Sequence, residues 1–229
     1  MLFKKTKKVQ TMEEKLNTLR AGVLGSNDGI LTVVGVLFSV GAATTNHFTI
    51  FIAGLSDLIA CAFSMAAGEY ASVSTQKDTE KAVVTNEQTL IGTNYEHQLQ
   101  HVTSYYQDKG VTPETAAAIA QELMKQSPLQ TVVNVKHNIH LGHYVNPWFA
   151  ALASLFSAGL GGCLPLLAIT FLPTSYQWPG TIMAVVLSVA LTGYMSAKLG
   201  RGFIKKAIIR NVIIGIITMF IHYYVGILI

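Results

Sequence analysis

Two long apolar segments near the amino end constrain the fold of this chain more than any other feature. They cover about residues 21–43 and 48–72, and a short uncharged link joins them. Because a helix needs roughly 20 residues to cross the hydrocarbon core of a bilayer, each segment can span a membrane. Three more segments of this kind follow, at about residues 147–171, 181–199 and 207–226. The sequence therefore predicts an all-α integral membrane protein with five transmembrane helices.

The composition also sets one polar segment apart from these spans. Of the 229 residues, 51% are hydrophobic and only 12% are charged, which is unlike an ordinary soluble domain. Residues 73–145 differ, because they hold seven carboxylates and five histidines. Helices are expected there at about 79–109, 113–126 and 131–143. We expect four parts, namely a basic amino-terminal segment (1–20), spans one and two (21–72), a helical segment that could bind metal (73–145), and spans three to five (146–229).

The positive charges predict how the chain is oriented in its membrane. With five spans, all sixteen Lys and Arg residues fall on one side: six before span one, five between spans two and three, and five between spans four and five. Since positively charged loops stay in the cytosol, we expect the amino terminus and residues 73–145 to be cytosolic. The basic amino end has no apolar core and is not a cleavable signal peptide. Its lack of a targeting extension favours a bacterial plasma membrane, with a vacuolar membrane as the alternative.

Three carboxylates lie inside or at the edge of the first two apolar segments. A charged side chain there costs on the order of 3 kcal/mol, so Asp28, Asp57 and Glu69 indicate an ion or proton path. Other readings remain open: Asp28 could cap a helix at the interface, and Asp57 could form a helix–helix hydrogen bond in a dimer. Met65 and Glu69 are four residues apart, which places them on one helix face. A thioether beside a carboxylate suits Fe(II) or Mn(II) better than Mg or Ca, although methionine alone more often serves packing.

The polar segment carries a second group of candidate metal ligands. His97 and His101 share a helical face, as do His137 and His140, and this spacing permits metal binding. The alternative is a solvated helical domain whose histidines are incidental. The candidate collecting site comprises Glu87, Glu96, His97, His101 and Glu122, with His137, His140 and His143 as further imidazoles.

Several kinds of chemistry find no support in the sequence. The stretch HNIHLGH lacks the glutamate of a zinc-protease motif, and no GxSxG, P-loop or GxGxxG is present. Cys61 and Cys163 both lie in apolar segments and are interpreted as small packing residues. We therefore expect no enzymatic activity and no permanent cofactor. The distribution of the basic residues indicates membrane orientation and not nucleic-acid binding.

Four blocks of sequence together resemble a known family. These blocks are SNDGILTVVGVLFSVGAA, AGLSDLIACAFSMAAGEYASVSTQKDTE, NPWFAALASLFSAGLGGCLPLLA and GYMSAKLG, and they cover all five spans. They closely resemble the vacuolar iron transporter family. The resemblance implies that Asp28, Met65 and Glu69 line a translocation path between two subunits. Glu87 fits the start of a glutamate series that the family places after span two. Leu90, Gln98 and His101 stand where further acids recur in that family.

The residues and the resemblance together predict a membrane transporter. The resemblance implies a homodimer that exports Fe(II) or Mn(II) from the cytosol in exchange for protons, with both subunits embedded in a lipid bilayer. Asp57 lies about 18 Å from Glu69 along the helix, nearer the outer side, where it could pass protons or receive the released cation. The alternative is a membrane-anchored metal sensor or scaffold that binds metal without ion flux.

Overall fold

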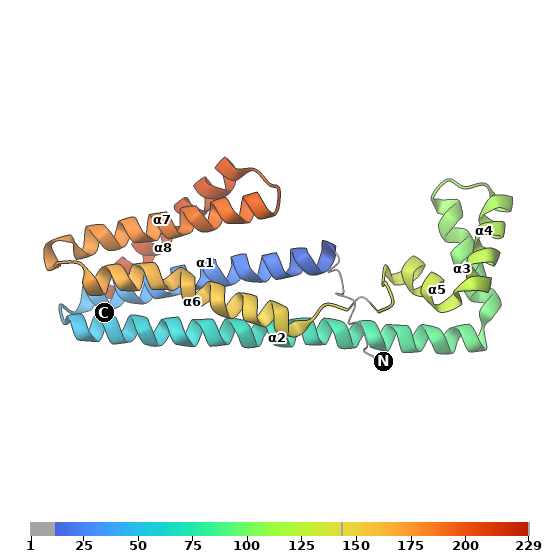
Figure 1. Ribbon diagram of the computed structural model, residues 1–229, viewed down its shortest axis with the longest axis horizontal. Helices are drawn as coiled ribbons and strands as arrows, with labels where there is room; N and C mark the ends of the chain where they lie inside the picture. Colours follow the sequence, from blue (N-terminus) through green and yellow to red (C-terminus); the bar gives the residue numbers. More distant parts are fainter. Residues whose placement is uncertain (1–11, 143, 229) are drawn as a thin grey trace, which may run out of the picture. The chain divides into compact units, whose positions relative to one another are not determined.

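All regular structure in the described part of the chain, residues 12–142 and 144–228 of a computed structural model, is helical. Five of the helices are long and apolar enough to cross a membrane, namely α1, α2, α6, α7 and α8. This confirms the predicted all-α fold with five membrane-spanning helices (Figure 1). The elements in chain order are α1 (Met12–Ala43), α2 (His47–Thr93), α3 (Tyr95–Asp108), α4 (Pro113–Gln126), α5 (Pro128–His137), α6 (Pro147–Phe171), η1 (Thr174–Tyr176), α7 (Gln177–Leu199) and α8 (Ile204–Leu228).

The observed helix ends differ from the predicted ones at several places. α1 begins at Met12, inside the segment expected as the basic amino-terminal part, and α2 runs through residue 72 without a break. The helix expected at 79–109 is divided at Asn94, whose side chain caps α3 by accepting a hydrogen bond from the His97 amide. α7 begins at Gln177 and not at 181, because Pro179 fits within a first helical turn. These changes leave the number of spans unaltered.

The chain forms two compact units, and each is described by itself. The first comprises residues 1–72 and 146–229, and the second comprises Val73–Val145. The second unit therefore has the bounds of the polar segment, whose cytosolic location stays a prediction. Its core is formed by Val102, Ala120, Met124 and Val132, which join α3, α4 and α5.

Helix α1 is the packing centre of the first unit. One face of α1 packs against α7 and α8, where Ile30 and Val34 contact Val185, Val189 and Met219. The opposite face packs against α2 and α6 in a second cluster. That cluster comprises Val33, Leu37, Ile50, Leu58, Leu166 and Ile169. Because α1 is covered on both sides, residues along it have fixed neighbours on several other helices.

Small residues bring the backbones of α1 and α6 into direct contact. A Cβ atom on Gly29 would run into the carbonyl oxygen of Ala158, and one on Gly25 would lie 2.7 Å from the carbonyl oxygen of Ser154. Gly162 of α6 meets Gly29 in the same way from the other side. In a membrane, helices associate through close van der Waals packing, since lipid tails are as apolar as leucine. This contact fixes the segment of α1 that contains Asp28.

We expect a methyl group to be tolerated at Gly22 and harmful at Gly29. Nothing lies within 4 Å of a Cβ atom at Gly22, so Gly22→Ala should preserve or slightly raise stability, by up to about 1 kcal/mol through helix propensity. Gly29→Ala must separate α1 from α6 and should lower the unfolding temperature of the purified protein by several degrees. Circular dichroism of both variants in the same detergent measures the difference. Equal unfolding temperatures would contradict the close α1–α6 contact.

Candidate functional site

Four side chains of α2 form a polar stripe within its apolar part. Asp57, Cys61, Met65 and Glu69 follow one another at intervals of four residues, so each lies one helical turn beyond the last. Cys61 and Glu69 are 8% and 7% exposed, and Asp57 and Met65 are half-buried. The stripe extends the predicted pair of Met65 and Glu69 by two turns.

Asp28 of α1 contacts this stripe at Cys61. The Cys61 thiol donates a hydrogen bond to Asp28 Oδ2 over 3.4 Å. A cysteine expected to serve packing alone is thus a polar partner of the carboxylate. The bond is long and weak, and it leaves most of the accepting capacity of Asp28 unused.

Asp57 lies one turn from Cys61 and has an incompletely satisfied carboxylate. Its Oδ2 atom is buried and forms no hydrogen bond of normal geometry within the described residues, although Thr32 of α1 lies close enough to interact with the carboxylate. Asp28 and His222 of α8 both lie within electrostatic reach of Asp57. Buried oxygens without partners are costly in an apolar environment, so they are suited to receive a proton or a cation.

Helix α8 contributes a histidine that the sequence did not single out. The His222 ring packs onto Gly35 of α1, where a Cβ atom would lie 2.8 Å from two ring atoms. The Ser39 hydroxyl donates to the His222 carbonyl oxygen over 2.9 Å and lies 3.4 Å from Nδ1. Three helices, α1, α2 and α8, therefore bring titratable or polar groups together on the Asp57 side of the stripe.

Glu69 lies at the other end of the stripe beside an arginine of α1. Arg20 Nη2 is 3.8 Å from Glu69 Oε2, a buried oxygen that has no hydrogen bond within the described residues. Since the Arg20 side chain is 62% exposed, this long ion pair contributes no more than about 1 kcal/mol. A cation that reaches Glu69 can therefore displace Arg20 at low cost.

The candidate residues of the path are spread along α2 and do not form one compact site. Cys61, which holds Asp28, is eight residues from Glu69, or about 12 Å along the helix. Among residues 12–142 and 144–228, no three His, Cys, Asp or Glu side chains gather into a group that could hold a metal ion. Within one chain, Glu69, Met65 and the Cys61–Asp28 pair therefore follow one another along α2.

In the second unit, Glu87 of α2 is tied to α5. Lys136 Nζ lies 3.0 Å from both carboxylate oxygens, and His137 Nε2 lies 2.9 Å from Oε1. Burial alone raises the pKa of Glu87, but hydrogen bonds from His137 and Lys136 and the positive charge of Lys136 outweigh it and lower the pKa below its ordinary value. In this arrangement Glu87 serves as an anchor for α5.

Among the described residues of the predicted collecting site, only His137 contacts Glu87. His97 and His101 lie on one face of α3 with ring centroids 4.5 Å apart, and Glu96 is exposed in the first turn of that helix. Glu122 of α4 accepts a hydrogen bond from Gln126 over 2.6 Å. His140 lies 3.1 Å from the Asn134 amide, whereas His143 lies outside the described residues. A shared metal site in this unit stays a prediction.

Five apolar helices with carboxylates set between them define an integral, multi-pass membrane protein that places charged groups inside its membrane-spanning part. The chain belongs to the VIT family, whose family model matches residues 19–227. It is 34% identical over 211 residues to the vacuolar iron transporter of Acanthamoeba castellanii, covering 92% of this chain and 78% of that protein. It is 31% identical to vacuolar iron transporter homolog 2 of Oryza sativa, covering 90% and 88%, and 29% identical to homolog 2.1 of Arabidopsis thaliana, covering 90% and 78%. The resemblance found in the sequence is thus confirmed.

We expect the Glu87 anchor to stabilise the protein in a pH-dependent way. Glu87→Gln leaves the Lys136 charge without its partner and should destabilise the fold by roughly 2 kcal/mol at pH 7. Because the folded pKa of Glu87 is lowered, this stabilisation is complete above the ordinary value of 4.5 and is lost as the pH falls below it. Thermal unfolding of the full protein at pH 7 and at decreasing pH values measures the effect.

The control for this prediction is Glu122→Gln, which removes an exposed carboxylate of the same unit and should change stability by less than about 0.5 kcal/mol. A Glu87→Gln variant as stable as the wild type at pH 7 would show that the contacts of Glu87 with Lys136 and His137 do not contribute to the free energy of unfolding.

Proposed function

We propose that this chain exports Fe(II) or Mn(II) from the cytosol in exchange for protons, through a path shared by two subunits. The observation that carries the proposal is the stripe of Asp57, Cys61, Met65 and Glu69 beside Asp28 in membrane-spanning helices. Carboxylates at such a depth are costly and serve ion or proton movement. The relatives named as vacuolar iron transporters support iron as the cargo.

The order of ligands along the stripe supports a stepwise passage. Glu69 lies nearer the predicted cytosolic side, beside an arginine that a cation can replace. Met65 offers a thioether one turn further on, which favours Fe(II) or Mn(II) over harder cations. Asp28 and then Asp57 supply carboxylates nearer the opposite side. Each group replaces part of the water shell of the passing ion.

Protons can drive the exchange because carboxylates bind a proton or a divalent cation, and not cheaply both. On the outer side, a proton on Asp57 or Asp28 weakens the hold on the metal and favours its release. Return of the proton to the cytosol restores the carboxylate for the next ion. His222, within electrostatic reach of Asp57, is placed to help deliver this proton.

Exposed small residues on α2 support a homodimer around the path. Ser56, Ala60, Ser64, Gly68 and Ser72 recur at every fourth position, and all five are exposed in the single chain. Repeats of small residues at this spacing let membrane helices approach closely. The first four of these residues each directly precede a residue of the polar stripe, so a second copy seated here would enclose the path.

We expect the path carboxylates to be essential for metal flux. Asp28→Asn and Glu69→Gln should each lower the initial rate of Fe(II) or Mn(II) uptake into proteoliposomes by at least tenfold, since about 1.4 kcal/mol of lost ion stabilisation gives that factor. Met65→Ala should act in the same direction. Fluxes are compared with and without a proton gradient, and with Co(II) and Zn(II) as competing ions.

The matched control for the flux measurement is Asp78→Asn, which removes an exposed carboxylate of the same helix outside the stripe and should leave flux unchanged. Normal metal uptake by both Asp28→Asn and Glu69→Gln would contradict the assignment of these two residues to the transport path. A metal flux that does not depend on the proton gradient would contradict the proposed exchange with protons. Metal binding without any flux would favour the alternative of a sensor or scaffold.

A second prediction concerns the dimer. A Cβ atom at Gly68 meets nothing within 4 Å in the single chain, so Gly68→Leu should disturb only a contact with another copy. Its purified dimer fraction should fall several-fold in light scattering after size exclusion. Gly159→Leu on α6 is the control, because Gly159 is equally open within the chain and lies outside the stripe of small residues. A Gly68→Leu dimer as abundant as that of the control would place the subunit contact elsewhere.

A further inference from the structure

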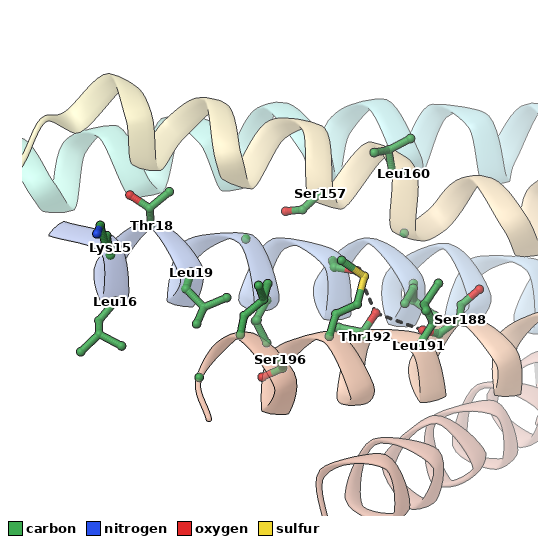
Figure 2. Close-up of a pocket in the computed structure, with 18 of the residues that line it drawn as sticks. Lys15, Leu16, Thr18, Leu19, Ser157, Leu160, Ser188, Leu191, Thr192 and Ser196 are labelled. Carbon is green, nitrogen blue, oxygen red and sulfur yellow. Dashed lines mark hydrogen bonds between the residues drawn. The ribbon is translucent and has the colours of Figure 1, made fainter. Parts of the chain in front are cut away.

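A cavity of about 860 Å³ opens between α1, α6 and α7, away from the carboxylate stripe. Its walls are mainly leucine, valine, isoleucine and methionine side chains, and two of them, Leu160 and Leu199, are more than 60% exposed. In Figure 2 the cavity extends from Lys15 and Leu16 at one end to Ser188 and Leu191 at the other. This volume lies within the range of about 300–1,000 Å³ typical of ligand sites.

Four of the hydroxyl groups in the walls form hydrogen bonds within the protein, which leaves much of the interior apolar. The hydroxyl groups of Ser26 and Thr192 lie 3.0 Å apart and form a hydrogen bond between α1 and α7. Ser157 donates to the Ser154 carbonyl oxygen over 3.1 Å, and Ser188 donates to that of Ala184 over 2.7 Å. A ligand in this part of the cavity therefore needs no polar group to satisfy these hydroxyl groups.

Two positive charges line one end of the same cavity. Lys15 lies near the start of α1, and Arg201 follows the end of α7, so both lie on the side where all Lys and Arg residues gather. Both side chains are exposed, and neither forms a salt bridge with a carboxylate that the structure describes. The site thus combines an apolar interior with a cationic end.

We propose that this cavity binds an anionic phospholipid from the cytosolic leaflet, with one acyl chain between α1, α6 and α7 and the phosphate beside Lys15 and Arg201. From Lys15 to Ile30 the cavity follows α1 for about 22 Å, which exceeds the roughly 15 Å depth of one leaflet. The cytosolic leaflet holds the anionic lipids that basic residues near a membrane attract. This inference is independent of the proposed transport.

The lipid site can be tested with phosphatidylglycerol and phosphatidylcholine that carry identical acyl chains. Native mass spectrometry of the purified full-length protein counts the lipids retained from detergent at increasing lipid concentration. We expect wild-type protein to retain phosphatidylglycerol in preference to phosphatidylcholine by on the order of tenfold. The double variant Lys15→Gln/Arg201→Gln should lose this preference, whereas Lys205→Gln, an exposed charge that does not line the cavity, should keep it.

A cavity-filling variant tests the acyl-chain part of the site. Gly22 lines the cavity and has open space around its Cβ position, so Gly22→Leu should fill the interior and reduce retention of both lipids several-fold. Gly159→Leu, which is equally open but lies outside the cavity lining, should bind as the wild type does. Equal retention of the two lipids by wild-type protein would overturn the proposal. So would normal phosphatidylglycerol retention by Gly22→Leu, or a changed oligomeric state of Gly22→Leu without any change in lipid retention.

Discussion

The backbone contact between α1 and α6 is the constraint on which the rest of the first unit depends. In an apolar solvent, helices gain little from covering apolar side chains, and close van der Waals contact must hold them together. Gly25, Gly29 and Gly162 allow this contact because they have no Cβ atom. Once α1 is fixed against α6, its remaining faces pack on α2, α7 and α8 through large apolar side chains. The helix that bears Asp28 is therefore the most firmly positioned one.

The polar groups of the spans depend on this arrangement. Asp28 reaches Cys61 because α1 and α2 are held side by side by Val33, Leu37 and Leu58. A carboxylate at this depth is tolerated when its neighbours are fixed and a charged or polar partner is within reach. The structure supplies only weak partners: a thiol at 3.4 Å and an arginine at 3.8 Å. Partners this weak leave both carboxylates able to accept a stronger ligand.

Much of the fold could be predicted from the sequence, whereas the partners of the candidate residues could not. The length and apolar composition of a span depend on residues close together in the chain, and they identified the five membrane-spanning helices. The spacing of four from Asp57 to Glu69 is also a local signal, although only its last pair was recognised. By contrast, Cys61 bonds to a residue 33 positions away, and Lys136 neutralises Glu87 across 49 positions. His222 contacts Ser39 across 183 positions. Only tertiary packing determines such pairs.

Arg20 gives the first unit a property that a bare carboxylate would lack. A single negative charge moved through a membrane experiences about 2.3 kcal/mol for every 100 mV of potential. With the guanidinium 3.8 Å from Glu69, the two charges largely offset each other when no metal is present. Any movement of this pair through the membrane field would then involve little electrical work. Under the proposed function, a divalent ion that replaced the arginine at Glu69 would add net positive charge there, so membrane voltage would act mainly on the metal-loaded form.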